Sequence, residues 1–267
     1  MRVPAFPMLL AVAWLAASCG DDVPATTPPA PTGGAGATAD DSTPDLVIDP
    51  GDGGSYSVDI DPARFSSTVD NPYLPKLPGT RWVYESNTPD GETEDITVEV
   101  LDEYRTVMGV EAIVVHDVVQ IDGEVIEDTY DWFAQDDDGN VWYLGEDTTA
   151  WEDGVASSEG AWEAGVDGAL PGIVMPAEPV VSDTGYRQEY LAGEAEDMGQ
   201  VIGVGRSVEV PAGSWDDTVT TRDWTPLEPD VVEEKTFARD VGFVHEIKPT
   251  GDGAGEEVVL VEFTPGG

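Results

Sequence analysis

Apolar and polar residues alternate along most of the chain with a period of two. In the stretch DITVEVLD, residues 95–102, the apolar positions are Ile96, Val98 and Val100. Successive side chains of a strand point to opposite faces of a sheet, whereas a helix repeats its apolar residues about every 3.6 positions. The pattern therefore predicts strands. Similar β-branched stretches occur at residues 111–120 and 256–263.

Turn signals separate the predicted strands at residues 108–109, 122–123 and 138–139. The last two are Asp-Gly pairs, which suit turns in which both central residues have positive φ. No segment has the pattern of a long amphipathic helix, and no repeat occurs at a fixed period. The glycines of GQVIGVGRS, residues 199–207, are expected to bend a strand. We expect an all-β fold, either a curved antiparallel meander sheet or an incomplete β-barrel.

The N-terminus has the pattern of an export signal. After Arg2, the apolar run FPMLLAVAWLAAS is too short to span a bilayer and ends in small residues. The string LAASC resembles the lipobox that precedes a lipid-modified cysteine, here Cys19. We expect a lipoprotein signal peptide at residues 1–18, a lipidated Cys19 with a disordered Pro/Gly/Asp-rich linker over 19–66, and one β domain over 67–267. Ordinary secretion without lipid is the alternative.

The chain is strongly acidic, with 55 Asp plus Glu residues against 11 Lys plus Arg and a net charge of −44. Such a charge repels nucleic acid and anionic head groups, so neither is an expected surface partner. The simplest interpretation is solubility in an ion-rich habitat. Cys19 is the only cysteine, so the domain must form its core without disulfides.

The segment DWFAQDDDGNVWYLGED, residues 131–147, suggests either a calcium loop or the tip of a hairpin. If Gly139 takes the sixth position of an EF-hand loop, Asp136 and Asp138 take the third and fifth, but Ala134 and Gly145 fall where the loop needs acidic ligands. A hairpin explains all the residues, with two aromatic strands and a DDDGN turn. We favour the hairpin and keep Asp136 and Asp138 as candidate Ca²⁺ ligands. No other cofactor is expected.

Catalytic patterns are sparse. The two histidines, His116 and His245, lie in predicted strands without a serine or cysteine in a nucleophile context, and no close pair of ligands suits zinc. Carboxylate pairs remain, and two carboxylates are what glycoside hydrolysis requires. The candidates are Glu159 with Glu163, and Glu194, Glu196 and Asp197. With 55 acids in the chain, chance pairs are common.

Four strings carry a resemblance: NPYLPKLPGTRWVYES, YDWFAQDDDGNVWYLGED, EGAWEAGVDGALPGIVMPAEP and YRQEYLAGEAEDMG. They are similar to a broad group of bacterial secreted proteins and lipoproteins with no established activity, over most of residues 70–265. The string VEVPAGSW followed by EKTFARDVGFVHEI is similar to a β-sheet ending of several periplasmic families, although Ala238-Arg239-Asp240 replaces their Ala-Pro-Gly step. The resemblance implies an extracytoplasmic β protein.

The polarity of the fourth string suggests a ligand site, because packing in an apolar core explains it poorly. A concave sheet could present its residues and nearby aromatics to a small molecule or a glycan. We therefore expect a lipid-anchored, non-enzymatic binding or envelope-associated module. The alternatives are a carboxylate-dependent glycoside hydrolase and a calcium-stabilised cell-surface module. The candidate ligand-binding residues are Trp132, Trp142, Arg187, Glu189, Tyr190, Glu194, Glu196 and Asp197.

Overall fold

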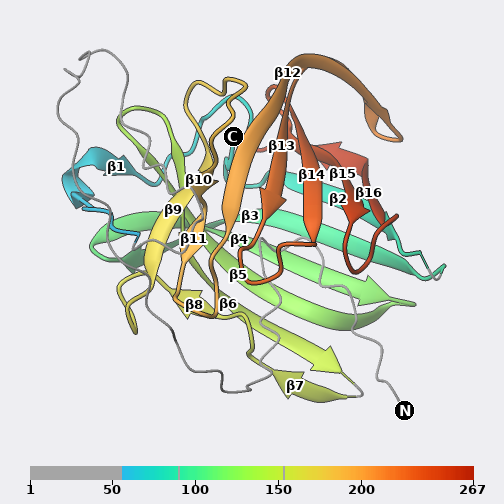
Figure 1. Ribbon diagram of the computed structural model, residues 1–267, viewed down its shortest axis with the longest axis horizontal. Helices are drawn as coiled ribbons and strands as arrows, with labels where there is room; N and C mark the ends of the chain where they lie inside the picture. Colours follow the sequence, from blue (N-terminus) through green and yellow to red (C-terminus); the bar gives the residue numbers. More distant parts are fainter. Residues whose placement is uncertain (1–55, 90, 153) are drawn as a thin grey trace, which may run out of the picture.

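The computed structural model describes residues 56–267 apart from residues 90 and 153 (Figure 1). The predicted signal peptide, Cys19 and the linker up to residue 55 lie outside these residues. Within the described part, the regular secondary structure consists of strands and a single 3-10 helix, η1. The prediction of an all-β fold is confirmed.

The strands are long in the first half of the domain and at its end, and short where the sheet closes. Their bounds, with η1 at Pro62–Arg64, are β1 Phe65–Ser66, β2 Arg81–Asn87, β3 Thr93–Val107, β4 Val110–Ile121, β5 Glu124–Asp136, β6 Val141–Glu152, β7 Val155–Ser157, β8 Trp162–Glu163, β9 Leu170–Met175, β10 Tyr186–Arg187, β11 Glu189–Tyr190, β12 Met198–Val210, β13 Gly213–Trp224, β14 Val232–Ala238, β15 Gly242–Thr250 and β16 Glu257–Thr264.

Neighbouring strands of the sheet pair antiparallel in the order β10-β12-β13-β14-β15-β16-β2-β3-β4-β5-β6-β9-β11. Most neighbours are also consecutive in sequence, as in a meander, while β16 pairs with β2 and so joins the end of the chain to the start of the sheet. In Figure 1 strands β3 to β6 run along the lower part of the molecule, and β12 to β14 stand across them. The sheet therefore curls around an interior.

A five-residue segment, residues 186–190, brings the two ends of the sheet together. Its first two residues pair with β12 and its last two pair with β9. Gly172 of β9 makes this approach possible, because a Cβ at this position would lie only 2.4 Å from the carbonyl oxygen of Arg187. The sheet is in this way nearly closed into a barrel.

The predicted tight turns between β3, β4 and β5 are confirmed. Met108 and Asp122 have φ values of 50° and 52°, and the glycine after each also has positive φ, so both turns have the backbone of a two-residue hairpin. The turn at residues 137–140 also joins two paired strands, which confirms the hairpin. The prediction that Asp138 has positive φ is wrong, because only Gly139 does so in this turn.

The β12 strand bends as predicted for its glycine-rich stretch. Its pairing with β13 shifts register at three points between Val201 and Val208, and Gly205 has a φ of 62°. Bulges of this kind increase the twist and curvature of a strand. They help to turn the second half of the sheet toward the first.

Residues 56–66, expected to belong to the linker, pack against the domain. Tyr56 is buried and its hydroxyl donates to the carbonyl oxygen of Pro171 at 2.8 Å. Phe65 pairs with Asp136 of β5 and lies edge-on to Trp142, with ring centroids 5.8 Å apart. The structured part of the chain thus begins before residue 67.

One loop, residues 69–76, spans one end of the barrel and is here called the capping loop. It is held by a bridge between Val69 and Lys76 and by Asn71, whose Nδ2 donates to the carbonyl oxygens of Gly139 and Pro176 at 3.0 and 3.2 Å. On the other side, the amide of Asp240 donates to the carbonyl oxygen of Pro72 at 2.7 Å. The loop is fixed to both halves of the sheet.

No helix among the described residues is long and apolar enough to cross a membrane.

Candidate functional site

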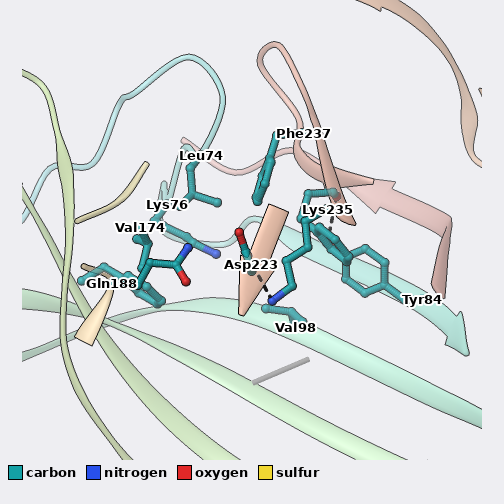
Figure 2. A pocket seen from close by; sticks show the side chains of 11 residues that line it. Leu74, Lys76, Tyr84, Val98, Val174, Gln188, Asp223, Lys235 and Phe237 are labelled. Atoms are coloured by element: carbon teal, nitrogen blue, oxygen red, sulfur yellow. Dashed lines mark hydrogen bonds and ion pairs between the residues drawn. The ribbon is translucent and has the colours of Figure 1, made fainter. Parts of the chain in front are cut away.

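A cavity of about 80 Å³ lies inside the curled sheet. Side chains reach it from widely separated strands and from the capping loop, and Figure 2 shows them converging on one space. A cavity of this volume holds several water molecules or a small solute, since one water needs roughly 10–15 Å³ by this measure. The lining residues are Leu74, Lys76, Tyr84, Val98, Phe133, Val174, Gln188, Asp223, Lys235, Phe237 and Phe243.

Lys76 is the polar group of the cavity that comes from the capping loop. Its ammonium lies 5.1 Å from the ring centroids of both Trp82 and Phe133. Among the described residues, no hydrogen bond or ion pair reaches its Nζ, although the residue is only partly exposed. Burial lowers the pKa of Lys76 to about 8, against the opposing influence of Asp131 and Asp117. The amine is therefore mainly charged at neutral pH and has donors to offer.

Lys235 of β14 is held very differently. Its Nζ lies 2.8 Å from Glu233, 3.4 Å from Asp223 and 3.9 Å from Glu246. Burial opposes the charged amine, but Glu233, Asp223 and Glu246 together raise the pKa of Lys235 well above its ordinary value. Lys248 extends the network with Glu256 at 3.3 Å. These residues form the paired side of the interior.

The interior is acidic on the opposite side, along β4, β5 and β6. Asp117, Glu127, Asp131 and Glu146 are all at most 5% exposed, and no lysine or arginine forms an ion pair with them among the described residues. Burial raises the pKa of Asp131 to about 6 and that of Glu127 to about 7. The hydroxyl of Tyr143 donates to Asp131 at 2.7 Å. These four carboxyls form the unpaired side of the interior.

The structure gathers most of the predicted residues of the polar string around the closing segment. Arg187 donates to the carbonyl oxygen of Glu196 at 2.6 Å, and its guanidinium lies 5.0 Å from the ring centroid of Tyr190. Glu189 and Asp197 are fully buried, and burial raises the pKa of both carboxyls.

None of these residues lines the cavity; from the closing segment only Gln188 does so. Glu194 is exposed in the turn that follows β11. The polarity of the string thus has a structural role, since Arg187, Glu189 and Asp197 lie buried where the barrel closes. That any of the predicted residues contacts a ligand stays a prediction.

The two predicted tryptophans lie elsewhere. Trp132 is buried, and the guanidinium carbon of Arg105 lies 3.9 Å from the centroid of its ring. Because side chains alternate along a strand, Trp132 points away from its neighbour Phe133, which lines the cavity. The Nε1 of Trp142 donates to Asp136 at 2.8 Å. Each tryptophan therefore has its contacts within the protein.

The carboxylates proposed for calcium are engaged in the hairpin turn. Asp136 accepts hydrogen bonds from the amides of Asp138 and Asn140 at 3.0 and 2.9 Å, besides the one from Trp142. These bonds fix the turn, which explains why Asp138 does not need positive φ. Asp138 itself lies 2.8 Å from the guanidinium of Arg64. Over residues 56–267 without 90 and 153, no group of three or more His, Cys, Asp or Glu side chains is arranged to hold a metal ion.

The residues of the enzymatic alternative have separate surroundings. Glu159 is exposed, and Glu163 forms an ion pair with Arg105. Both histidines face a carboxylate, His116 with Asp128 at 3.2 Å and His245 with Glu257 at 2.9 Å. Glycoside hydrolysis stays a prediction, and these contacts do not support it.

Sequence reasoning missed Lys76, Asp223 and Lys235 of the cavity. The sequence contained an indication of these residues, because the chain has only three lysines beside its 55 acidic residues. Lys235 occupies an inward position of a strand, between Glu233 and Phe237 at spacing two. A lysine that the period of a strand places inward must find partners or a cavity.

Fold and cavity together define a class: a nearly closed, antiparallel β protein with a small cavity inside the sheet, lined mainly by aromatic and aliphatic side chains. No family model matches the chain, and no curated protein matches it in sequence.

Two solved structures are similar in fold. One is of a candidate exported protein with a YmcC-like fold from Bacteroides fragilis, 15% identical, covering 73% of this chain and 100% of its own, with a TM-score of 0.40. The other is of a candidate lipoprotein from Parabacteroides distasonis, 13% identical, covering 73% and 99%, also with a TM-score of 0.40. Likeness at this level does not indicate what the chain binds.

Proposed function

We propose that this protein is an extracytoplasmic, lipid-anchored binding protein whose barrel interior takes a small, mainly apolar molecule. The observation that carries the proposal is the cavity, because its aromatic and aliphatic walls come from both halves of the sheet and enclose an ammonium without a hydrogen-bond partner among the described residues. Pockets for small molecules combine apolar walls with a few placed polar groups. The paired carboxylates of the enzymatic alternative are not gathered at this cavity.

The location rests on the sequence. The apolar run before Cys19, the small residues that precede it and the Pro- and Gly-rich stretch that follows are typical of an anchored and exported protein. Wild-type protein should partition into the detergent phase of Triton X-114, and the Cys19→Ser variant into the aqueous phase. Equal partitioning of the two would contradict a lipid at Cys19.

Binding is tested with the exported Cys19→Ser chain, labelled at its Leu and Val methyl groups. Titration with 1-pentanol, a small neutral and apolar probe, should shift the methyl signals of Leu74, Val98 and Val174 along one saturable curve. Filling the cavity with Val174→Phe should abolish the response at Leu74 and Val98. The matched control is Val155→Phe, because Val155 is 69% exposed on β7.

Two results would overturn the binding proposal. One is the absence of a saturable shift at the cavity methyls. The other is an equal response in the Val174→Phe variant, which would place the probe outside the cavity.

A further inference from the structure

The chain has three lysines, and two of them, Lys76 and Lys235, line the cavity. Figure 2 shows both side chains directed toward the enclosed space from different elements, with Asp223 between them in this view. The charge of Lys235 is matched by three carboxylates within 4 Å. Lys76 has no such match in the described part of the chain. The cavity thus holds one cation whose hydrogen-bond donors are available to a ligand.

The other charges near Lys76 do not replace a direct partner. Asp223 is already engaged with Lys235 at 3.4 Å. Asp131 accepts from Tyr143, and burial raises the pKa of Asp117 well above its usual range, which favours the neutral form of this carboxyl. A buried ammonium left without an acceptor is costly, whereas a charge-assisted bond to a carboxylate is among the strongest hydrogen bonds in proteins.

The walls of the cavity restrict the chemistry and size of the part of a ligand that does not contact Lys76. Leu74, Val98 and Val174 offer aliphatic surface. Aromatic rings and three polar side chains form the rest of the lining beside Lys76: Tyr84, Phe133, Phe237, Phe243, Gln188, Asp223 and Lys235. The volume of about 80 Å³ suits a chain of a few carbon atoms. An acceptor at one end and a short hydrocarbon at the other match this lining.

We propose that the cavity binds a short carboxylic acid, whose carboxylate accepts hydrogen bonds from Lys76 Nζ while its hydrocarbon tail lies among Leu74, Val98 and Val174. This inference rests on the proposed binding function and names its ligand class. The role of Lys76 is to select the carboxylate, and the apolar walls hold the tail.

The test compares pentanoate with 1-pentanol, which have the same tail length and differ in the head group. The protein is the exported Cys19→Ser chain, and affinities are read from the methyl shifts of Leu74, Val98 and Val174. Wild-type Lys76 should favour pentanoate about tenfold or more, the size expected for one charge-assisted hydrogen bond. Lys76→Met should remove this preference and still bind 1-pentanol, whereas Lys76→Arg should keep part of it.

A second readout uses ¹³Cε-labelled lysine, which gives only three signals in this chain. Pentanoate should raise the pKa of Lys76 from about 8, because the carboxylate favours the charged amine, and should leave the signal of Lys235 nearly unchanged. Pentanoate affinity should accordingly fall as the pH rises through this value in the wild type.

The outcomes separate the two proposals. If 1-pentanol binds at the cavity methyls but pentanoate binds no tighter, or if the preference persists in Lys76→Met, the carboxylate proposal is overturned and the cavity proposal stands. If neither compound shifts the cavity methyls, the proposed binding function itself fails.

Discussion

Both sides of the barrel interior carry buried carboxyl groups, but in the described part of the chain only those of one side form ion pairs with lysines. On the paired side, Asp223, Glu233 and Glu246 surround Lys235 within 4 Å. On the unpaired side, Asp117, Glu127, Asp131 and Glu146 have no ion pair with a lysine or arginine among the described residues. On the paired side, Lys235 and Lys248 lower the pKa of Glu233, although burial still raises the pKa of Asp223 and brings that of Glu246 to about 8. On the unpaired side, burial raises the pKa of the carboxyls without a lysine in contact. The difference shows that burial of acids alone does not identify a site; the partners do.

The largest effect is expected from removing the central lysine of the paired side. Lys235→Met leaves three buried carboxylates without their shared partner and should lower the free energy of unfolding by about 3–5 kcal/mol. Urea denaturation at pH 7 measures this change. Lys76→Met is the matched comparison, and we expect a much smaller loss because no ion pair is broken. Equal losses would show that the two sides do not differ as described.

The unpaired side should make stability fall as the pH rises. Burial raises the pKa of Glu127 from 4.5 to about 7, so its contribution is fully present below pH 4.5 and is lost as the pH rises through about 7. Glu127→Gln removes this titration. It should raise the free energy of unfolding at pH 8 by up to about 3 kcal/mol and leave it unchanged at pH 4.

The control for this prediction is Glu124→Gln, at an exposed position of the same strand. This substitution should leave the free energy of unfolding unchanged at both pH values. Denaturation curves of the three proteins at pH 4 and pH 8 give the comparison. A Glu127→Gln effect of the same size at both pH values would assign it to packing and not to protonation.

A smaller effect is expected at the loop that carries Lys76 to the cavity. Asn71→Ala removes the bonds from Nδ2 to Gly139 and Pro176 and should cost about 2 kcal/mol. It should also shift the Leu74 methyl signals, because the Oδ1 of Asn71 accepts from the Leu74 amide at 3.3 Å. Thr68→Ala, at an exposed position just before the capping loop, is the control. Unchanged Leu74 methyl signals in a folded Asn71→Ala variant would contradict the anchoring role of Asn71.

The strands could be predicted well from the sequence, because polar outward residues and apolar inward residues alternate along them with a period of two. Ile96, Val98 and Val100 are all buried on β3 as expected. The same rule concealed the interior acids: Asp117 on β4 and Glu127 on β5 occupy positions whose polarity normally indicates solvent. Pairing between strands distant in sequence decides which face turns inward, and the local pattern does not contain it.

The cavity was not predictable from local sequence for a related reason. Lys76 lies in a proline-rich stretch without a period, and its place in the interior depends on contacts of the capping loop with both halves of the sheet. The string YRQEYLAGEAEDMG was correctly singled out as unusual. Its polar residues lie buried at the closure of the barrel, which the sequence could not reveal without the pairing of residues 186–190 with β9 and β12.

The closing segment also has a kinetic consequence. Residues 186–190 gain their strand pairing only when β9 and β12 are both in place, so we expect closure to be a late event in folding. The amide of Gln188, which donates to the carbonyl oxygen of Asp197 at 2.7 Å, should become protected in pulse-labelling hydrogen exchange after the amides of β12 and β13. Simultaneous protection would show that the barrel forms in one step. A late closure means that the cavity is open to solvent in the last folding intermediate and that a ligand could be enclosed as the barrel completes.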